Sequence, residues 1–286
     1  MKLINQSYEI CKTHGYTLQD VYKDIERAAR VSYKSEDKIT EDSAEKMVQR
    51  LISMKHYSPL EFGTIYLKIK TTTCIKMIAN PEGCFAKPWV YYTTVSDIEN
   101  EGTTYYYITT NYRFIIENGL EDLLQYMCEP TEHHQNRTTV KFITNRAVTH
   151  ELVRHRSMSF MQESQRFIAY DKGKFGSEIT FIKQAWEQSE DEKTLMEHTL
   201  SQIEDTYMKL RKLGLKPQQA RTVLPNATKT ELYMCGFDKD WEHFFDLRDK
   251  THVDPQMYNL AHPLHEEFNK IKHEKISEQE RETENG

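Results

Sequence analysis

The sequence predicts a single domain of the α+β class. Segments that alternate like half-buried strands are interleaved with amphipathic helical segments, without the regular strand–helix–strand rhythm of a parallel α/β sheet. No repeat of fixed period is visible, and 286 residues are ample for one large core. The 38% of hydrophobic residues, together with only 10 Gly and 8 Pro, exclude collagen-like and low-complexity disordered classes.

The N-terminal part is expected to contain two helices followed by a strand. Residues 19–30 and 41–55 place apolar side chains at three-to-four spacing, which predicts two amphipathic helices. Pro59 breaks the second pattern. Residues 62–70 then alternate apolar and polar side chains, as half-buried strands do.

The middle of the chain is expected to form a hairpin, a helix and a further strand. Residues 89–95 and 103–110 are rich in aromatic and β-branched side chains, which predicts a hairpin with a long loop. Residues 111–128 are expected to be helical, and residues 137–144 alternate like a strand. Asn145 is a good N-cap for a helix that starts at the next residue.

The last part is expected to be mainly helical after short strands and turns in residues 157–182. A long amphipathic helix is predicted over residues 193–213, and the following glycine closes it. Residues 217–225 predict a short helix, and residues 240–272 are mostly helical with interruptions near their prolines. The polar tail, residues 274–286, is expected to be disordered.

Charge and cysteine usage exclude several broad classes of function. The 38 Lys and Arg against 44 Asp and Glu give a formal charge of −6, which argues against sequence-independent DNA binding. No apolar run is long enough to span a membrane, and the N-terminus lacks an apolar leader segment, so we expect a cytoplasmic protein. The five cysteines are scattered without a CxxC pair, which favours free thiols: Cys11, Cys74, Cys84, Cys128 and Cys235.

The densest polar cluster lies in residues 151–166. Val148 and Leu152 lie one helical turn apart and should face the core, which turns Glu151 and Arg154 onto a neighbouring face where they can meet. Arginine forks, hydroxyl groups and turn N–H groups together make a phosphate or oxyanion site. The alternative is an ordinary solvated surface with dipole compensation at a helix end.

Other candidate sites are weaker. His262, His265 and Glu266 have a spacing that could touch a metal ion, but a proline lies between the histidines and no third ligand is near, so no metal site is predicted. The sequence contains no GxGxxG, GxxxxGK[ST] or GxSxG pattern, so neither a dinucleotide or P-loop site nor a nucleophile elbow is indicated.

The polar cluster also carries a family signature. Arg154-His155-Arg156, followed after seven residues by Ser164, resembles the RHRx7S motif of the flavin-dependent thymidylate synthases of the ThyX type. Four further blocks resemble that family in the family's order: RAARVSY at 27–33, HYSPLE at 56–61, ARTVLP at 220–225 and FFDLR at 244–248. Five ordered blocks are far more specific than one motif.

The resemblance implies a fold and an activity. The fold is a mixed, mainly antiparallel sheet flanked by helices in one domain, residues 1–273, with residues 71–136 as a hairpin-plus-helix insertion relative to short members. The activity is reductive methylation of dUMP to dTMP, with methylenetetrahydrofolate as one-carbon donor, FAD as hydride carrier and NADPH as reductant. The implied assembly is a homotetramer with FAD between subunits, and no nucleic acid, membrane or metal takes part.

The resemblance also assigns roles to individual residues. The implied dUMP contacts are Glu151, Arg154, Gln162, Glu163, Ser164, Gln165, Arg166, Arg221 and Arg248. The implied FAD contacts are His56, Ser58, Arg154, His155, Arg156, Gln162 and His243. The catalytic residue is Arg248, which would stabilise negative charge on the uracil and make its C5 more nucleophilic. We expect the arginines and Ser164 to converge in one cleft.

Three departures from the family pattern bear on the site. Glu151 stands where the family often has Gln, so its carboxylate must be paired, as with an arginine, or it repels an anionic substrate. Phe237-Asp238-Lys239 replaces an Asn-Ala-Arg triplet that contributes to the flavin site. Phe62 stands where a His is expected.

Three alternatives compete with this interpretation. A conventional thymidylate synthase needs an activated cysteine, but none of the five cysteines follows a proline or lies beside a basic cluster. Ser164 could be a nucleophile, but no base is positioned by sequence to activate it. A nucleic-acid or phosphate-binding module could use the RHR triplet with nearby aromatics, but the acidic balance and the other blocks then have no role. A flavin-yellow purified protein would favour the enzyme.

Overall fold

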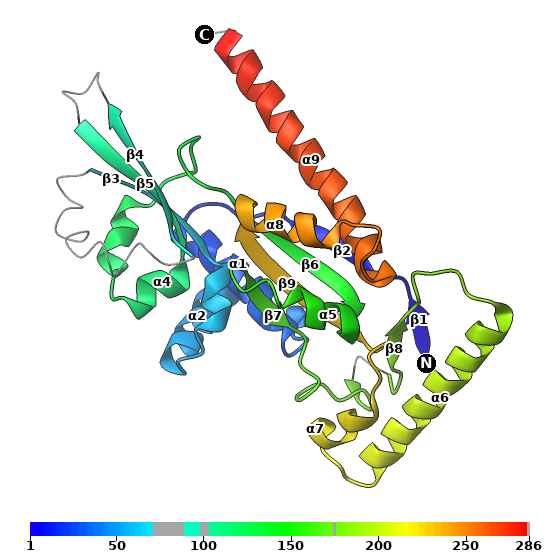
Figure 1. Ribbon diagram of the computed structural model, residues 1–286. Helices are drawn as coiled ribbons and strands as arrows, with labels where there is room; N and C mark the ends of the chain where they lie inside the picture. Colours follow the sequence, from blue (N-terminus) through cyan, green and yellow to red (C-terminus); the bar gives the residue numbers. More distant parts are fainter. Residues whose placement is uncertain (71–88, 98–102, 174–175, 285–286) are drawn as a thin grey trace.

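Three sheets organise the molecule in the computed structural model, which describes residues 1–70, 89–97, 103–173 and 176–284 (Figure 1). The central sheet has the order β2 (Ser7–Cys11), β6 (Arg137–Asn145), β9 (Lys229–Phe237) and β7 (Ser159–Gln162), with neighbours antiparallel. The second, also antiparallel, has the order β3 (Thr64–Lys70), β5 (Thr103–Asn111) and β4 (Tyr91–Asp97). A short parallel pair joins β1 (Lys2–Ile4) to β8 (Thr180–Ile182).

Helices cover these sheets. The α-helices are α1 (Leu18–Val31), α2 (Ser43–Ser53), α4 (Tyr112–Glu117), α5 (Arg146–Leu152), α6 (Glu190–Lys212), α7 (Pro217–Ala220), α8 (Asp238–Arg248) and α9 (Pro255–Glu284). Short 3₁₀ segments are η1 (Glu36–Lys38), η2 (Ser58–Phe62), η3 (Glu121–Tyr126) and η5 (Arg221–Val223). Among the described residues, no helix combines the length and apolar character needed to cross a lipid bilayer.

The central sheet is buried on both faces. One face carries Phe142 and Leu232, which pack in one core cluster with α5, α8 and α9, including the fully buried Trp241. The opposite face carries Tyr233 and Cys235, which pack against the α1 residues Ala28 and Val31. Helices therefore lie on both sides of an antiparallel sheet, which confirms the predicted α+β class.

Several local predictions are confirmed because the sequence signal and the burial agree. In β3, Ile65, Leu67 and Ile69 are all fully buried on one face. The predicted hairpin is the β4–β5 pair, whose loop lies outside the described residues. Asn145 caps α5, since its side-chain oxygen accepts a hydrogen bond from the N–H of Val148 at 2.9 Å.

Three strands were not predicted from the sequence. β1 and β2 at the N-terminus are short, and β2 lies at the edge of the central sheet. β9 is the more important omission, because it is a central strand and pairs with β6 and β7. Residues 230–237 are all buried, so the strand lacks the alternation by which half-buried strands are recognised.

The predicted helical boundaries need three corrections. The helix expected over 111–128 is two pieces, α4 and η3, because Gly119 adopts a left-handed φ of 63° between them. Pro263 does not interrupt the helix, as was expected, but lies inside α9. The tail expected to be disordered from residue 274 continues α9 to Glu284, and the frequent glutamates of this segment favour a helix.

Candidate active site

Helix α5 and the turn that follows it position the signature triplet. The helix has seven residues and so is about 10 Å long. Beyond its end, the N–H of Arg154 donates to the carbonyl of Glu151 at 3.2 Å, and the N–H of His155 donates to the carbonyl of Leu152 at 3.2 Å. These backbone hydrogen bonds fold the chain tightly, so the triplet is held at the C-terminal end of α5.

Arg248, the last residue of α8, joins this end of α5 through three hydrogen bonds. Its Nη1 donates to Oε2 of Glu151 at 2.5 Å, and its Nη2 donates to the Glu151 carbonyl at 3.3 Å. Its Nε donates to Nε2 of His155 at 3.2 Å. The guanidinium is thus fixed in position by a carboxylate, a carbonyl and an imidazole, and the pairing expected for Glu151 is found.

His155 is neutral at physiological pH. Burial lowers its pKa most, and the positive charges of Arg248 and the nearby His243 and Arg154 lower it further, to about 4. A neutral imidazole that accepts a hydrogen bond at Nε2 must carry its proton on Nδ1. His155 therefore orients Arg248 without adding a second positive charge.

A cavity of about 410 Å³ opens at this position. Its lining combines the turn after α5 with the C-terminal half of α8: Arg154, His155, Arg156, Ser157, His243, Leu247 and Arg248. The guanidinium groups of Arg154, Arg156 and Arg248 thus line one small cavity. Glu151 contacts this cavity's Arg248 but is not part of the lining. Such a site favours an anion.

The N-terminal end of α5 carries a second group. Arg146 donates from Nη2 to the Glu163 carbonyl at 2.9 Å, and Glu163 donates its N–H to the Glu231 carbonyl at 2.8 Å. Lys229 binds Oε2 of the buried Glu163 at 3.0 Å and also pairs with Glu231. Gln162 donates to the Thr149 hydroxyl at 2.9 Å. The loop that begins at Gln162 is thereby anchored to both α5 and β9.

The rest of this loop extends toward α7. Ser164 donates its N–H to the Ser32 carbonyl at 3.2 Å, and its hydroxyl oxygen accepts the N–H of Arg166 at 3.2 Å. Arg166 donates from Nε to Gln218 at 3.4 Å. Arg221 begins η5 nearby. The pKa of Arg146 is lowered mainly by burial, and the positive charge of Arg221 lowers it further. The amide nitrogen of Gln165 is buried.

The expected residues therefore form two groups within one chain. Arg154 and Arg248 line the cavity at the C-terminal end of α5, whereas Ser164, Arg166 and Arg221 belong to the group at its N-terminal end. The reason is topological, because β7 runs in the same direction as β6 and returns the chain to the start of α5. This differs from the single cleft that the sequence led us to expect.

The remaining implied flavin residues lie elsewhere. His56 and Ser58 are exposed around the start of η2, and neither lines the cavity. In the divergent triplet, Phe237 is buried, Asp238 accepts a hydrogen bond from Asn136 at 3.4 Å, and the Lys239 ammonium lies 4.7 Å from the ring centroid of Tyr91.

A buried ion network next to Glu163 was missed from the sequence. Glu231 pairs with Lys34, Lys141 and Lys229. Burial alone would raise the pKa of Glu231, but the lysines outweigh it and lower that pKa to about 2. The signal was available in the alternation of Lys229 and Glu231, and it could have been used only if β9 had been recognised.

The structure does not support a cysteine nucleophile among the described residues. Burial raises the pKa of Cys11 to about 11 and also raises that of Cys128, while Cys235 is fully buried, so none of these thiols is activated. Cys74 and Cys84 lie outside the described residues. His262 and His265 each bind an oxygen of Asp249 through Nδ1, at 2.9 and 2.7 Å.

The family model of the thymidylate synthase complementing proteins matches residues 15–77 and 99–272. The break at 78–98 lies within the expected insertion 71–136, whose boundaries stay a prediction.

Curated relatives cover part of the chain. The flavin-dependent thymidylate synthase of Corynebacterium glutamicum is 30% identical over 164 residues, covering 52% of this chain and 60% of the relative. That of Pyrococcus furiosus is 31% identical over 160 residues, covering 54% and 63%. The chain thus spans about 60% of the length of these relatives.

A solved structure, the UMP/dUMP methylase PolB from Streptomyces cacaoi bound with 5-Br dUMP, is 16% identical with a TM-score of 0.42, covering 94% of this chain and 93% of that chain. The family assignment does not depend on this structure, because the family model alone matches most of the sequence. The resemblance expressed by the five sequence blocks is confirmed, and the chain belongs to the thymidylate synthase complementing protein family.

Proposed function

We propose that this protein converts dUMP to dTMP by reductive methylation in dTMP biosynthesis. Methylenetetrahydrofolate gives the one-carbon unit, NADPH gives the reducing equivalents, and FAD when bound supplies hydride transfer. The observation that carries the proposal is the guanidinium group of Arg248, held by Glu151 and His155 beside the family's RHR triplet. The names of the curated relatives support the same activity.

The residues around the first cavity fit a flavin. A reduced flavin carries negative charge on its ring, and its pyrophosphate carries more. Arg154 and Arg156 are permanently charged, and the neutral imidazole of His155 can accept or donate hydrogen bonds beside the ring of His243. These groups would hold the anionic parts of FAD, while the preorganised cations stabilise its charge without reorganisation.

Arg248 has the geometry for activating a uracil. A fixed guanidinium beside the pyrimidine favours the anionic form of the base, which raises electron density at C5. Glu151 and His155 hold this guanidinium in place before the substrate arrives. Glu151 also offsets part of the positive charge, so an incoming anion competes with it for Arg248.

The group at the N-terminal end of α5 suits the nucleotide phosphate. Gln162, Glu163, Ser164, Gln165 and Arg166 form the loop, and Arg221 lies near it. Turn N–H groups, a hydroxyl and arginine forks are the donors that bind phosphate in proteins. Lys229 neutralises the buried Glu163, which removes its repulsion of a phosphate.

A homotetramer reconciles the two groups with one reaction. Each chain carries the arginine cluster around Arg248 at one end of α5 and the phosphate loop at the other end. In a tetramer, the arginine cluster of one subunit can therefore face the phosphate loop of a neighbouring subunit. His56 and Ser58 are exposed, as an interface contact to FAD on another subunit requires. Closed symmetric assemblies of this kind are common among soluble enzymes. The cytoplasmic location expected from the sequence stays a prediction.

The proposal is tested by the absorbance of the flavin-loaded protein and by product analysis. NADPH should bleach the flavin band, and chromatography should then reveal dTMP only when dUMP and methylenetetrahydrofolate are both present. Bleaching without dTMP under complete conditions would contradict methylation while leaving flavin binding intact.

A further inference from the structure

A second, larger cavity lies apart from the RHR triplet and is not used by the proposed reaction. Its volume is about 500 Å³, which is in the range of small-molecule sites. It is bounded by β2, the first residues of β6, helix α1, and the packed helices α8 and α9. Figure 1 shows α9 beside α8 and β2 before the helix extends away from the rest of the molecule.

The walls of this cavity are largely aromatic and aliphatic. Phe245, Phe268 and Ile271 form one side, on α8 and α9. Phe62 and Tyr66, from η2 and β3, also line the space. Aromatic walls of this kind favour a planar ring, because ring contacts bury much area with defined geometry.

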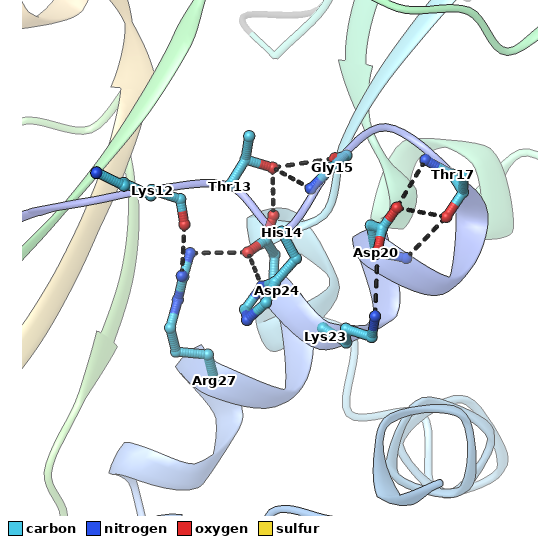
Figure 2. Close-up of polar contacts among 9 residues, drawn as sticks. All are labelled: Lys12, Thr13, His14, Gly15, Thr17, Asp20, Lys23, Asp24 and Arg27. Atoms are coloured by element: carbon cyan, nitrogen blue, oxygen red, sulfur yellow. Dashed lines mark hydrogen bonds and ion pairs between the residues drawn. The ribbon is translucent and has the colours of Figure 1, made fainter. Parts of the chain in front are cut away.

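Most charges that line the cavity are already paired. Asp24 binds Nδ1 of His14 at 2.7 Å, the Thr13 hydroxyl at 2.9 Å and Nη2 of Arg27 at 2.8 Å; Figure 2 shows this network, which joins α1 to the chain before it. Two further acids line the cavity. Glu242 pairs with Lys272 at 3.3 Å, and Asp238 accepts a hydrogen bond from Asn136.

Arg137 is the exception among the lining cations. Its Nη1 donates to two neutral oxygens, the Glu61 carbonyl at 3.0 Å and the Thr64 hydroxyl at 3.2 Å. Its guanidinium carbon lies 5.5 Å from the ring centroid of Phe237. Within the described residues, no carboxylate forms an ion pair with it, and its buried Nε has no hydrogen-bond partner. A partly buried cation without an anionic partner is costly, so the site favours an anion.

We propose that this cavity binds a small aromatic monoanion, whose ring lies against Phe245 and Phe268 and whose acid group pairs with Arg137. A single negative charge matches the single unpaired cation. A second charge would meet Asp24, Asp238 and Glu242, so dianions are disfavoured. The lining of this cavity shares no residue with that of the cavity beside the RHR triplet, and the inference does not depend on the proposed reaction.

Fluorescent probes of one shape and different charge test this site directly. Anilinonaphthalene sulfonate carries one negative charge, and phenylnaphthylamine is its uncharged analogue. Arg137→Met should weaken the sulfonate by about tenfold or more, the usual cost of losing a charge-assisted hydrogen bond, and leave the neutral probe within about twofold. Lys270→Met removes an equal charge from an exposed position outside the cavity and should change neither affinity.

Further experiments test where the probe binds and which ligand charge the site prefers. Ile271→Trp fills the cavity from α9 and should abolish binding of both probes while the unfolding midpoint stays unchanged. Naphthoate should displace the sulfonate more effectively than naphthyl phosphate, since the latter carries a second charge. A saturating concentration of FAD should not displace the anilinonaphthalene sulfonate.

The proposal is overturned by any of three results. The wild-type protein could fail to bind the sulfonate, Arg137→Met could weaken both probes equally, or FAD could compete with the probe. The last result would put the flavin in this cavity. Because bound flavin is measured separately by its absorbance, failure here is distinguishable from failure of the proposed reaction.

Discussion

Arg248 and Glu151 lie 97 positions apart in the chain and form an ion pair in which Nη1 is 2.5 Å from Oε2. The pair fastens the end of α8 to the end of α5, next to the RHR triplet. It gives the proposed catalytic arginine a fixed place and a competing partner. Several expectations about activity and stability depend on this relationship.

Arg248→Gln should reduce tritium release from labelled dUMP by about a hundredfold or more. The reason is that a preorganised charge aimed at developing negative charge contributes that much to catalysis. The loss should appear in kcat, with circular dichroism unchanged. Lys209→Gln removes an exposed charge on α6 and serves as the control. Equal losses in both variants would contradict a catalytic role for Arg248.

Glu151→Gln should keep most of the activity and bind dUMP more tightly. A glutamine can still accept a hydrogen bond from Arg248, but it no longer competes with an anionic substrate for the charge. The dUMP dissociation constant, measured by equilibrium titration, should fall. A loss of activity as large as that of Arg248→Gln would assign the carboxylate a chemical role that the geometry does not predict.

Acidification should destabilise the protein through His155. Its pKa in the folded protein is about 4 against a reference of 6.5, so between these values the unfolded chain binds more protons than the folded one. Stability is therefore fully present above pH 6.5 and falls as the pH drops toward 4, by on the order of 3 kcal/mol at most.

The matched variant for this prediction is His155→Gln, which can accept the Arg248 hydrogen bond but does not titrate. Urea unfolding at fixed protein concentration should give a shallower pH dependence for this variant between pH 4 and 6.5. An unchanged slope would mean that another group titrates in this window.

Lys229→Met should destabilise the fold by about 3 kcal/mol, because it leaves Glu163 buried beside a second buried carboxylate without their shared cation. It should also raise the KM for dUMP, because Glu163 belongs to the loop proposed to bind the nucleotide phosphate. The double variant Lys229→Met with Glu163→Leu removes both members of the buried ion pair and should recover part of the stability. No recovery in urea unfolding would contradict this coupling.

Mixing two variants of strongly reduced activity tests the assembly. Arg248→Gln damages the group at one end of α5, and Arg166→Gln damages the loop at the other. If each complete site takes its two groups from different subunits, mixed tetramers contain some intact sites, so co-refolded variants should regain measurable activity. Complementary variants that stay inactive in verified mixed tetramers would place both groups of a site on one chain.

The local parts of the site could be predicted from the sequence, and the long-range parts could not. Asn145 and the RHR turn follow from capping and helix-end patterns within a few residues. The separation of Ser164 from Arg248 depends on the direction of β7, which pairs with the unrecognised strand β9. Burial on both faces hid β9, and with it the alternating Lys229 and Glu231.

Tritium release from dUMP labelled at C5, measured with the protein stripped of flavin and then reloaded with FAD, tests the proposed methylation most directly. Release should require FAD, NADPH and methylenetetrahydrofolate together. Release at the same rate without flavin, or no release from fully reloaded and folded protein, would contradict the proposed methylation.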